Sequence, residues 1–208
     1  MSHEEAQLER IVNLGGDRHK ILEFYEDWAS TYARDVVEGI GYTGHVLTAK
    51  AVTARVGPEA EILDVGCGTG LVAVELKQRR PALRIDGIDL TRGMLDEAEE
   101  TQAYRSLVLG DMNHPLDADD DTYDGIVSSG VFTTGHVGPE RIDELVRVAR
   151  PGAPIVLAIR DTAWEGEGFS AHVDLLERQG RLRVEESRRE PYLLKTGVFC
   201  QLCVLAAA

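Results

Sequence analysis

The stretch Glu61-Ile-Leu-Asp-Val-Gly-Cys-Gly-Thr-Gly70 is the most informative part of this 208-residue chain. Ile62, Leu63 and Val65 form a short apolar run around one acid, Asp64, which is typical of a buried strand. Three glycines follow at alternate positions, and glycine accepts unusual backbone angles while leaving no Cβ in the way of a ligand. A strand that ends in such a loop and leads into a helix can hold a nucleotide-like ligand against bare backbone.

The glycine spacing separates this loop from two better-known ones. It reads Asp-x-Gly-x-Gly-x-Gly, whereas dinucleotide-binding folds use Gly-x-Gly-x-x-Gly, and no phosphate-loop Gly-Lys-Ser/Thr follows it. Asp64 suits a ligand with a positive or hydrogen-donating end better than a pyrophosphate. On these residues alone, a glycine-rich turn in an unrelated α/β protein stays open.

Apolar runs and helical patterns alternate along the rest of the chain. Because short strands separated by helices form parallel sheets with helices on both faces, we predict a doubly wound α/β fold with a seven-stranded, mostly parallel sheet. Residues 188–197 contain no helix, so the last two strands should pair antiparallel, with the last strand reversed. The expected strands are 62–65, 84–88, 107–109, 125–128, 155–159, 182–187 and 198–205, and the expected helices are 19–34, 44–56, 71–80, 92–103, 140–149 and 170–179.

Acids follow the second and third expected strands. Asp89 lies about 20 residues beyond the glycine loop, where an α/β nucleotide site places an acid on ribose hydroxyls. Its alternative role is to cap the helix that begins after Thr91. Asp111 follows the third strand and could equally be a turn residue. Asp64, inside its strand, needs partners to offset burial, and we expect backbone donors of the glycine loop, acting directly or through water.

The expected helix 19–34 carries aromatic residues on one face. Tyr25, Trp28 and Tyr32 recur at three- and four-residue spacing. Such a stripe commonly packs into a core, but aromatic faces also attract positively charged ligands. One division would bury Phe24 and Tyr25 and leave Trp28 and Tyr32 facing a ligand.

The amino-acid composition limits the kinds of binding partner that we expect. The net charge of −14 repels phosphate backbones, so we expect no nucleic acid, and no apolar run approaches the length of a membrane span. The acidic N-terminus is not a secretory signal, and the sparse cysteines fit a reducing cytoplasm. Cys200-x-x-Cys203 lies in an expected strand, where a separation of three places the two side chains on opposite faces. With no second cysteine pair to complete a zinc site, and with Asp117–Asp121 interpreted as a solvated loop, we expect no metal.

Residues 61–70 resemble motif I of the class I S-adenosylmethionine-dependent methyltransferases. Residues 25–32 resemble the Tyr-Asp-x-Trp-Ala-x-x-Tyr lid of many small-molecule methyltransferases, and 19–29, 62–73 and 129–137 look like the methyltransferase-like proteins named after the Williams-Beuren syndrome region. The resemblance implies S-adenosylmethionine as cofactor. It implies that the glycine loop holds the methionine part, that Asp64 orders this loop, that Asp89 binds the ribose and that Asp111 accepts the adenine amino group. The cofactor-binding residues implied in this way are Tyr25, Trp28, Tyr32, Asp64, Gly66, Cys67, Gly68, Gly70, Asp89, Leu90, Thr91, Met94, Asp111, Met112, Ser128 and Ser129.

The resemblance also implies one methyltransferase domain over 1–208, with 1–57 as a helical lid segment, acting on a small molecule. A cofactor-binding protein without transfer activity and a protein side-chain methyltransferase are the alternatives; the oligomeric state stays open. Residues 129–132 read Ser-Gly-Val-Phe in place of Asn/Asp-Pro-Pro-Tyr/Phe, which argues against methylation of amines on bases or glutamine.

A transferred methyl group often requires a base near the acceptor. His136 is the best-placed candidate for this catalytic role, with His45 and Tyr42 as weaker alternatives, although a loop histidine is commonly just solvated. Arg160 and Asp161 end the fifth expected strand, and we interpret them as a surface ion pair, with contact to a charged acceptor as the alternative.

Overall fold

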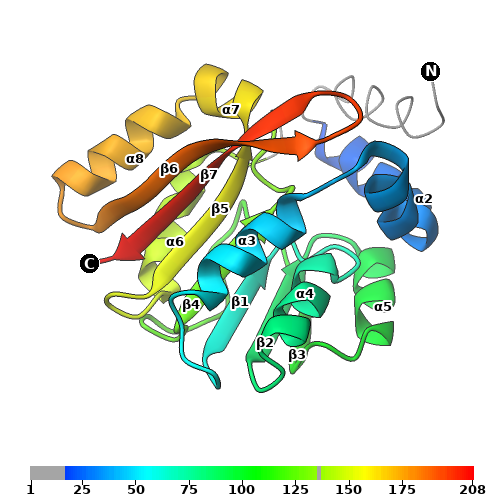
Figure 1. Ribbon diagram of the computed structural model, residues 1–208, viewed down its shortest axis with the longest axis horizontal. Helices are drawn as coiled ribbons and strands as arrows, with labels where there is room; N and C mark the ends of the chain where they lie inside the picture. The colour runs from blue at the N-terminus through cyan, green and yellow to red at the C-terminus, as the bar shows by residue number, and fades with distance from the viewer. Residues whose placement is uncertain (1–16, 135–136) are drawn as a thin grey trace.

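The computed structural model describes residues 17–134 and 137–208 and shows a seven-stranded sheet between two layers of helices (Figure 1). The strand order is β3-β2-β1-β4-β5-β7-β6. The strands are β1 Glu61–Val65, β2 Arg84–Asp89, β3 Ser106–Leu109, β4 Gly125–Ser129, β5 Pro154–Arg160, β6 Leu182–Leu193 and β7 Val198–Ala207. The helices are α2 Arg18–Arg34, α3 Gly44–Thr53, α4 Leu71–Arg79, α5 Arg92–Glu100, α6 Ile142–Val148, α7 Asp161–Gly166 and α8 Phe169–Arg178, with a π-helical turn at Asp35–Gly39 and a 3-10 turn at Pro139–Arg141.

The strand directions confirm the predicted fold class. Strands β1 to β5 pair in parallel, whereas β7 runs antiparallel to both of its neighbours, β5 and β6. Because the order reverses at β1, the carboxyl ends of β1 and β4 diverge into a crevice, which is where open α/β sheets bind ligands.

Each face of the sheet has its own apolar core. Helices α3 and α4 cover one face, and α6 and α8 cover the other (Figure 1). Alternate strand residues supply the two cores, as Ile126 and Val127 do in β4. Cys200 and Cys203 follow the same rule, because they are buried in opposite cores. The prediction that these two thiols face apart is therefore confirmed.

Three elements differ from the sequence prediction. Strand β6 continues to Leu193, so residues 188–193 pair with β7 and the connection shortens to residues 194–197. The charged residues 188–190 suggested a turn. They fit a strand because β6 is at the edge of the sheet, where one face of a strand is exposed to solvent. The short helix α7 and the π-helical turn Asp35–Gly39 were not predicted, because runs of five or six residues carry too little periodicity.

Helix α2 lies at the carboxyl end of the sheet, where it packs against α5 (Figure 1). Its N-cap is Asp17, whose carboxylate accepts hydrogen bonds from the amides of His19 and Lys20. No helix within residues 17–134 and 137–208 combines the length and apolar character needed to cross a bilayer.

Candidate active site

The glycine loop links β1 to α4 with three residues in the left-handed region. The φ angles are +66° at Gly66, +53° at Gly68 and +89° at Gly70. A Cβ on Gly66 would lie 1.8 Å from Val131 Cγ2. The loop is tied to the end of β2, since the Gly66 amide donates to the Ile88 carbonyl at 2.8 Å. Because these glycines carry no side chain, the loop presents bare backbone to the crevice.

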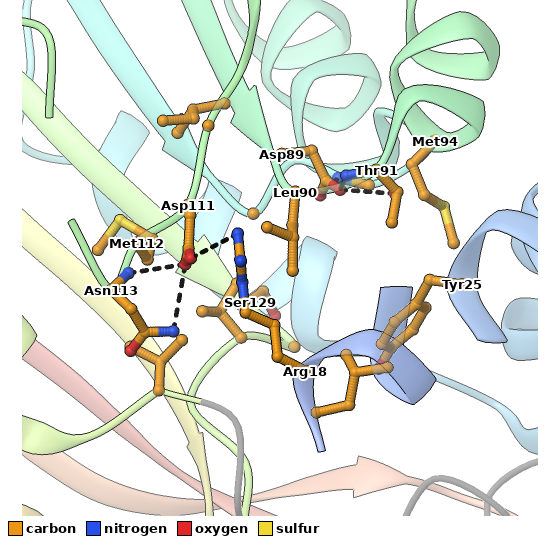
Figure 2. A pocket seen from close by; sticks show the side chains of 18 of the residues that line it. Arg18, Tyr25, Asp89, Leu90, Thr91, Met94, Asp111, Met112, Asn113 and Ser129 are labelled. Carbon is orange, nitrogen blue, oxygen red and sulfur yellow. Dashed lines mark hydrogen bonds and ion pairs between the residues drawn. The ribbon is translucent and has the colours of Figure 1, made fainter. Parts of the chain in front are cut away.

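A cavity opens over this loop at the carboxyl ends of β1 to β4, and helix α2 closes one side of it (Figure 2). We call it the first cavity. Eleven of the sixteen residues that the sequence assigned to the cofactor line it. Its lining comprises Arg18, Ile21, Tyr25, Tyr32, Gly66, Gly68, Ile88, Asp89, Leu90, Thr91, Met94, Gly110, Asp111, Met112, Asn113, Ser129, Gly130, Val131 and Val137.

Asp89 ends β2 beside the glycine loop. Its Oδ2 accepts from the Gly68 amide at 2.9 Å, and its Oδ1 accepts from the amide and the hydroxyl of Thr91 at 3.0 and 2.9 Å. Burial raises the pKa of Asp89 above its ordinary value, against these hydrogen bonds. Because each carboxylate oxygen has two lone pairs, Oδ2 can still accept a donor from a ligand. Thr91 is the N-cap residue of α5, but its hydroxyl donates to Asp89 and makes no hydrogen bond with the helix amides.

Asp111 follows β3 on the opposite side of the first cavity. It accepts from the Asn113 amide at 2.8 Å and forms an ion pair with Arg18 of α2 at 2.9 Å (Figure 2). Burial raises its pKa, but the hydrogen bonds from Asn113 and the charge of Arg18 outweigh burial and lower it overall. Asp111 is therefore ionised at neutral pH, and its ion pair with Arg18 connects the first turn of α2 to the opposite side of the cavity.

Asp64 is fully buried in β1, behind the loop and away from the cavity lining. Its Oδ2 accepts from the Tyr104 phenol at 2.8 Å, and the described residues make none of the direct hydrogen bonds that we expected from the glycine-loop backbone. Its Oδ1 has no hydrogen-bond partner among the described residues. Burial raises the pKa of Asp64 to about 7. Tyr104 precedes β3, and no sequence motif marked it as a partner.

The aromatic residues of α2 are split between core and cavity in a different way from the one we expected. Phe24 is core, while Tyr25 and Tyr32 line the first cavity. Trp28 is only 4% exposed and donates its indole N–H to Asp35 at 2.9 Å. Most of the Trp28 surface therefore packs into the core, which is the alternative role that we gave for the aromatic stripe.

The remaining assigned residues lie near the first cavity but outside its lining. Ser128 is fully buried and donates to the Val65 carbonyl at 2.9 Å. Cys67 is buried, and Gly70 is the N-cap residue of α4. His136 lies outside the described residues. Of the lining residues that the sequence interpretation missed, Arg18 carried no signal, whereas Asn113 follows Asp111-Met112 closely enough to have been considered.

Comparisons with known proteins give the family. The family model described as a methyltransferase domain matches residues 62–152. Methyltransferase-like protein 27 of Homo sapiens is 36% identical over 167 residues, covering 76% of this chain and 66% of the human protein. The chain belongs to the class I S-adenosylmethionine-dependent methyltransferases. It spans less than half the length of two further curated relatives, so comparison with them covers only part of those proteins.

Solved structures support the methyltransferase fold. A TehB-like SAM-dependent methyltransferase from Corynebacterium glutamicum superposes with a TM-score of 0.66 at 21% identity, covering 88% of this chain and 98% of that one. A methyltransferase in complex with the Haloferax volcanii Trm112 methyltransferase activator gives a TM-score of 0.65 at 20% identity, covering 88% and 97%.

The family's cofactor is S-adenosylmethionine, and the first cavity of this methyltransferase fits it. The Gly66 backbone is open on the cavity side, and Asp89 keeps an acceptor position for a hydroxyl. No cluster of histidine, cysteine, aspartate and glutamate in the described part of the chain is placed to hold a metal ion.

A second cavity adjoins the first and shares Tyr25, Tyr32 and Gly130 with it. Tyr42 connects the two, because this phenol lines the second cavity and donates at 2.7 Å to Ser129, which lines the first. The lining of the second cavity comprises Tyr25, Trp28, Tyr32, Val36, Ile40, Tyr42, Gly130, Thr133, Arg160, Tyr192 and Leu193.

The end of β5 corrects one interpretation. Asp161 pairs with Arg189 at 3.2 Å, whereas Arg160 lines the second cavity. The interpretation of Arg160 and Asp161 as a surface ion pair is therefore wrong, because consecutive residues at a strand end point in different directions. His45, a weaker base candidate, stacks on Tyr42 with ring centroids 5.3 Å apart, and burial lowers its pKa.

Proposed function

We propose that this methyltransferase transfers a methyl group from S-adenosylmethionine to a small-molecule acceptor. The observation that carries the proposal is the pair of adjoining cavities. One contains the bare glycine loop and the strand-end acids, the other has aromatic walls, and they meet at Tyr25, Tyr32 and Gly130. Two ligands seated in them would touch at this junction, which is what a direct transfer requires.

We assign the cofactor contacts by position in the first cavity. Asp89 would accept ribose hydroxyls, and Asp111 with Met112 would hold the adenine. Gly66 and Gly68 would leave room for the methionine part, while Asp64 lies behind the loop and accepts from Tyr104.

When bound, S-adenosylmethionine supplies an electrophilic methyl group on a positively charged sulfur. The phenol rings of Tyr25 and Tyr32 offer π-faces that suit such a charge. Helix α2 lines the junction through Tyr25 and Tyr32, and two contacts hold the helix there. These contacts are the ion pair between Arg18 and Asp111 and the hydrogen bond from the Gly93 amide to Glu26 at 3.0 Å.

Tritiated S-adenosylmethionine incubated with the protein and a small-molecule metabolite pool tests this function. We expect label in a small-molecule fraction and, in a separate thermal-shift assay, stabilisation by S-adenosylhomocysteine. The matched pair is Asp89→Asn, which should weaken both effects, and Asp96→Asn, on the exposed side of α5, which should keep them. Stabilisation without any label transfer would favour the cofactor-binding alternative, and label in protein would favour the side-chain methyltransferase.

We also propose a cytoplasmic location. All three cysteines are buried free thiols, which supports a reducing compartment.

A further inference from the structure

Arg160 is the one charged side chain that the described residues contribute to the second cavity. It ends β5, and its backbone amide donates to the Phe132 carbonyl at 3.1 Å. Its side chain is half-buried, and its Nε is buried without a hydrogen-bond partner in the described part of the chain. The nearest acid in sequence, Asp161, is engaged by Arg189.

A buried guanidinium N–H without a partner is costly, because the group loses its water and receives nothing in return. An acceptor on a bound ligand would satisfy it. The guanidinium is a planar fork that matches a carboxylate with two parallel hydrogen bonds. The geometry of Arg160 therefore favours a planar anion in this cavity.

The other walls define the charge and the body of that ligand. Tyr25, Tyr32, Tyr42 and Tyr192 are neutral phenols at pH 7, since burial raises the pKa of each, for Tyr192 to about 12. No carboxylate of the described residues lines the cavity, so an amine would meet Arg160 without a counter-charge. A phosphate dianion would find one cation where two charges need balancing. Tyr42 and Tyr192, with ring centroids 5.2 Å apart, leave an aromatic surface for an apolar body.

Resting on the proposed function, we propose that the methyl acceptor is a small organic acid with an apolar body, whose carboxylate pairs with Arg160 in the second cavity. Arg160 is then a specificity-determining residue for the acceptor, and it makes no contribution to binding the cofactor.

Calorimetry with S-adenosylhomocysteine present tests this assignment, using 3-phenylpropionate as the probe. The matched ligands are its uncharged amide, 2-phenylethyl phosphate and 2-phenylethylamine. We expect the carboxylate to bind about tenfold or more tightly than the amide, as for a hydrogen bond to a charged group. Arg160→Gln should remove this difference, Arg160→Lys should keep part of it, and Arg183→Gln, an exposed arginine of β6, should leave it intact.

The titration of S-adenosylhomocysteine itself separates the two proposals. If the wild type fails to bind it, the proposed function fails, and the carboxylate titration repeated without it still decides the role of Arg160. Equal affinity for acid and amide, tighter binding of the phosphate or the amine, or an unchanged preference in folded Arg160→Gln would overturn the inference and leave the function standing. If Arg160→Gln does not fold, the ratio of acid to amide affinity in the wild type decides.

Discussion

Replacing Gly66 by alanine should expose two separate constraints on the glycine loop. The first is the backbone, because a φ of +66° places an L-residue in the left-handed region, which costs about 1–2 kcal/mol. The second is space. The added Cβ would lie 1.8 Å from Val131 Cγ2, and valine cannot easily rotate away because its χ1 is stiff. Overpacking of this kind costs about 1–3 kcal/mol. The two together predict a loss of about 2–5 kcal/mol in the free energy of unfolding.

Gly68 provides the matched control. Its φ is +53°, but a Cβ there meets no heavy atom within 4 Å, so Gly68→Ala should lose only the backbone part, about 1–2 kcal/mol. Adding Val131→Ala to Gly66→Ala removes the clashing methyl group and should recover about 1–3 kcal/mol. Urea unfolding at constant m-value measures each variant, and the double-mutant cycle isolates the coupling. Equal losses for Gly66→Ala and Gly68→Ala, with no recovery from Val131→Ala, would show that Val131 does not constrain position 66.

Three further predictions concern the acids and the tryptophan. Asp89→Asn should weaken S-adenosylhomocysteine binding by about 2 kcal/mol, or roughly 30-fold, by calorimetry; unchanged affinity would remove Asp89 from the ribose role. The carboxyl of Asp64 has a folded pKa of about 7 against 3.8 unfolded, so the folded state holds more protons between these values. Its contribution to stability is therefore present at low pH and is lost as pH rises from about 4 to 7, by about 3–4 kcal/mol. Asp64→Asn should flatten this difference in urea titrations at several pH values, and parallel pH profiles would contradict the burial argument. Trp28→Phe should lower stability by about 1–3 kcal/mol, because buried Asp35 loses a donor, and leave S-adenosylhomocysteine affinity unchanged; a selective loss of affinity would instead make Trp28 a ligand contact.

The residues that the sequence placed well are those whose position follows from strand order. Asp89 ends β2 and Asp111 lies two residues beyond β3, and because these strands are parallel neighbours both carboxylates lie at the same edge of the sheet. Gly66 could be identified because glycines at alternate positions after a strand indicate a loop with unusual backbone angles, and its φ of +66° agrees with this.

The residues that the sequence missed depend on tertiary packing. Tyr104 reaches Asp64 across 40 positions, and Arg18 reaches Asp111 across the cavity. Nothing local distinguishes these side chains from other tyrosines and arginines. Arg160 shows the same limit, because its neighbour Asp161 suggested a local ion pair, whereas Arg189 on β6 takes that carboxylate.

A crystal structure of the protein with S-adenosylhomocysteine would show whether the first cavity is the cofactor site. We predict the ribose hydroxyls on Asp89, the adenine beside Asp111 and Met112, and the sulfur facing the junction at Tyr25 and Gly130. Density for the ligand at another surface, with the backbone of Gly66 and Gly68 uncovered, would contradict it.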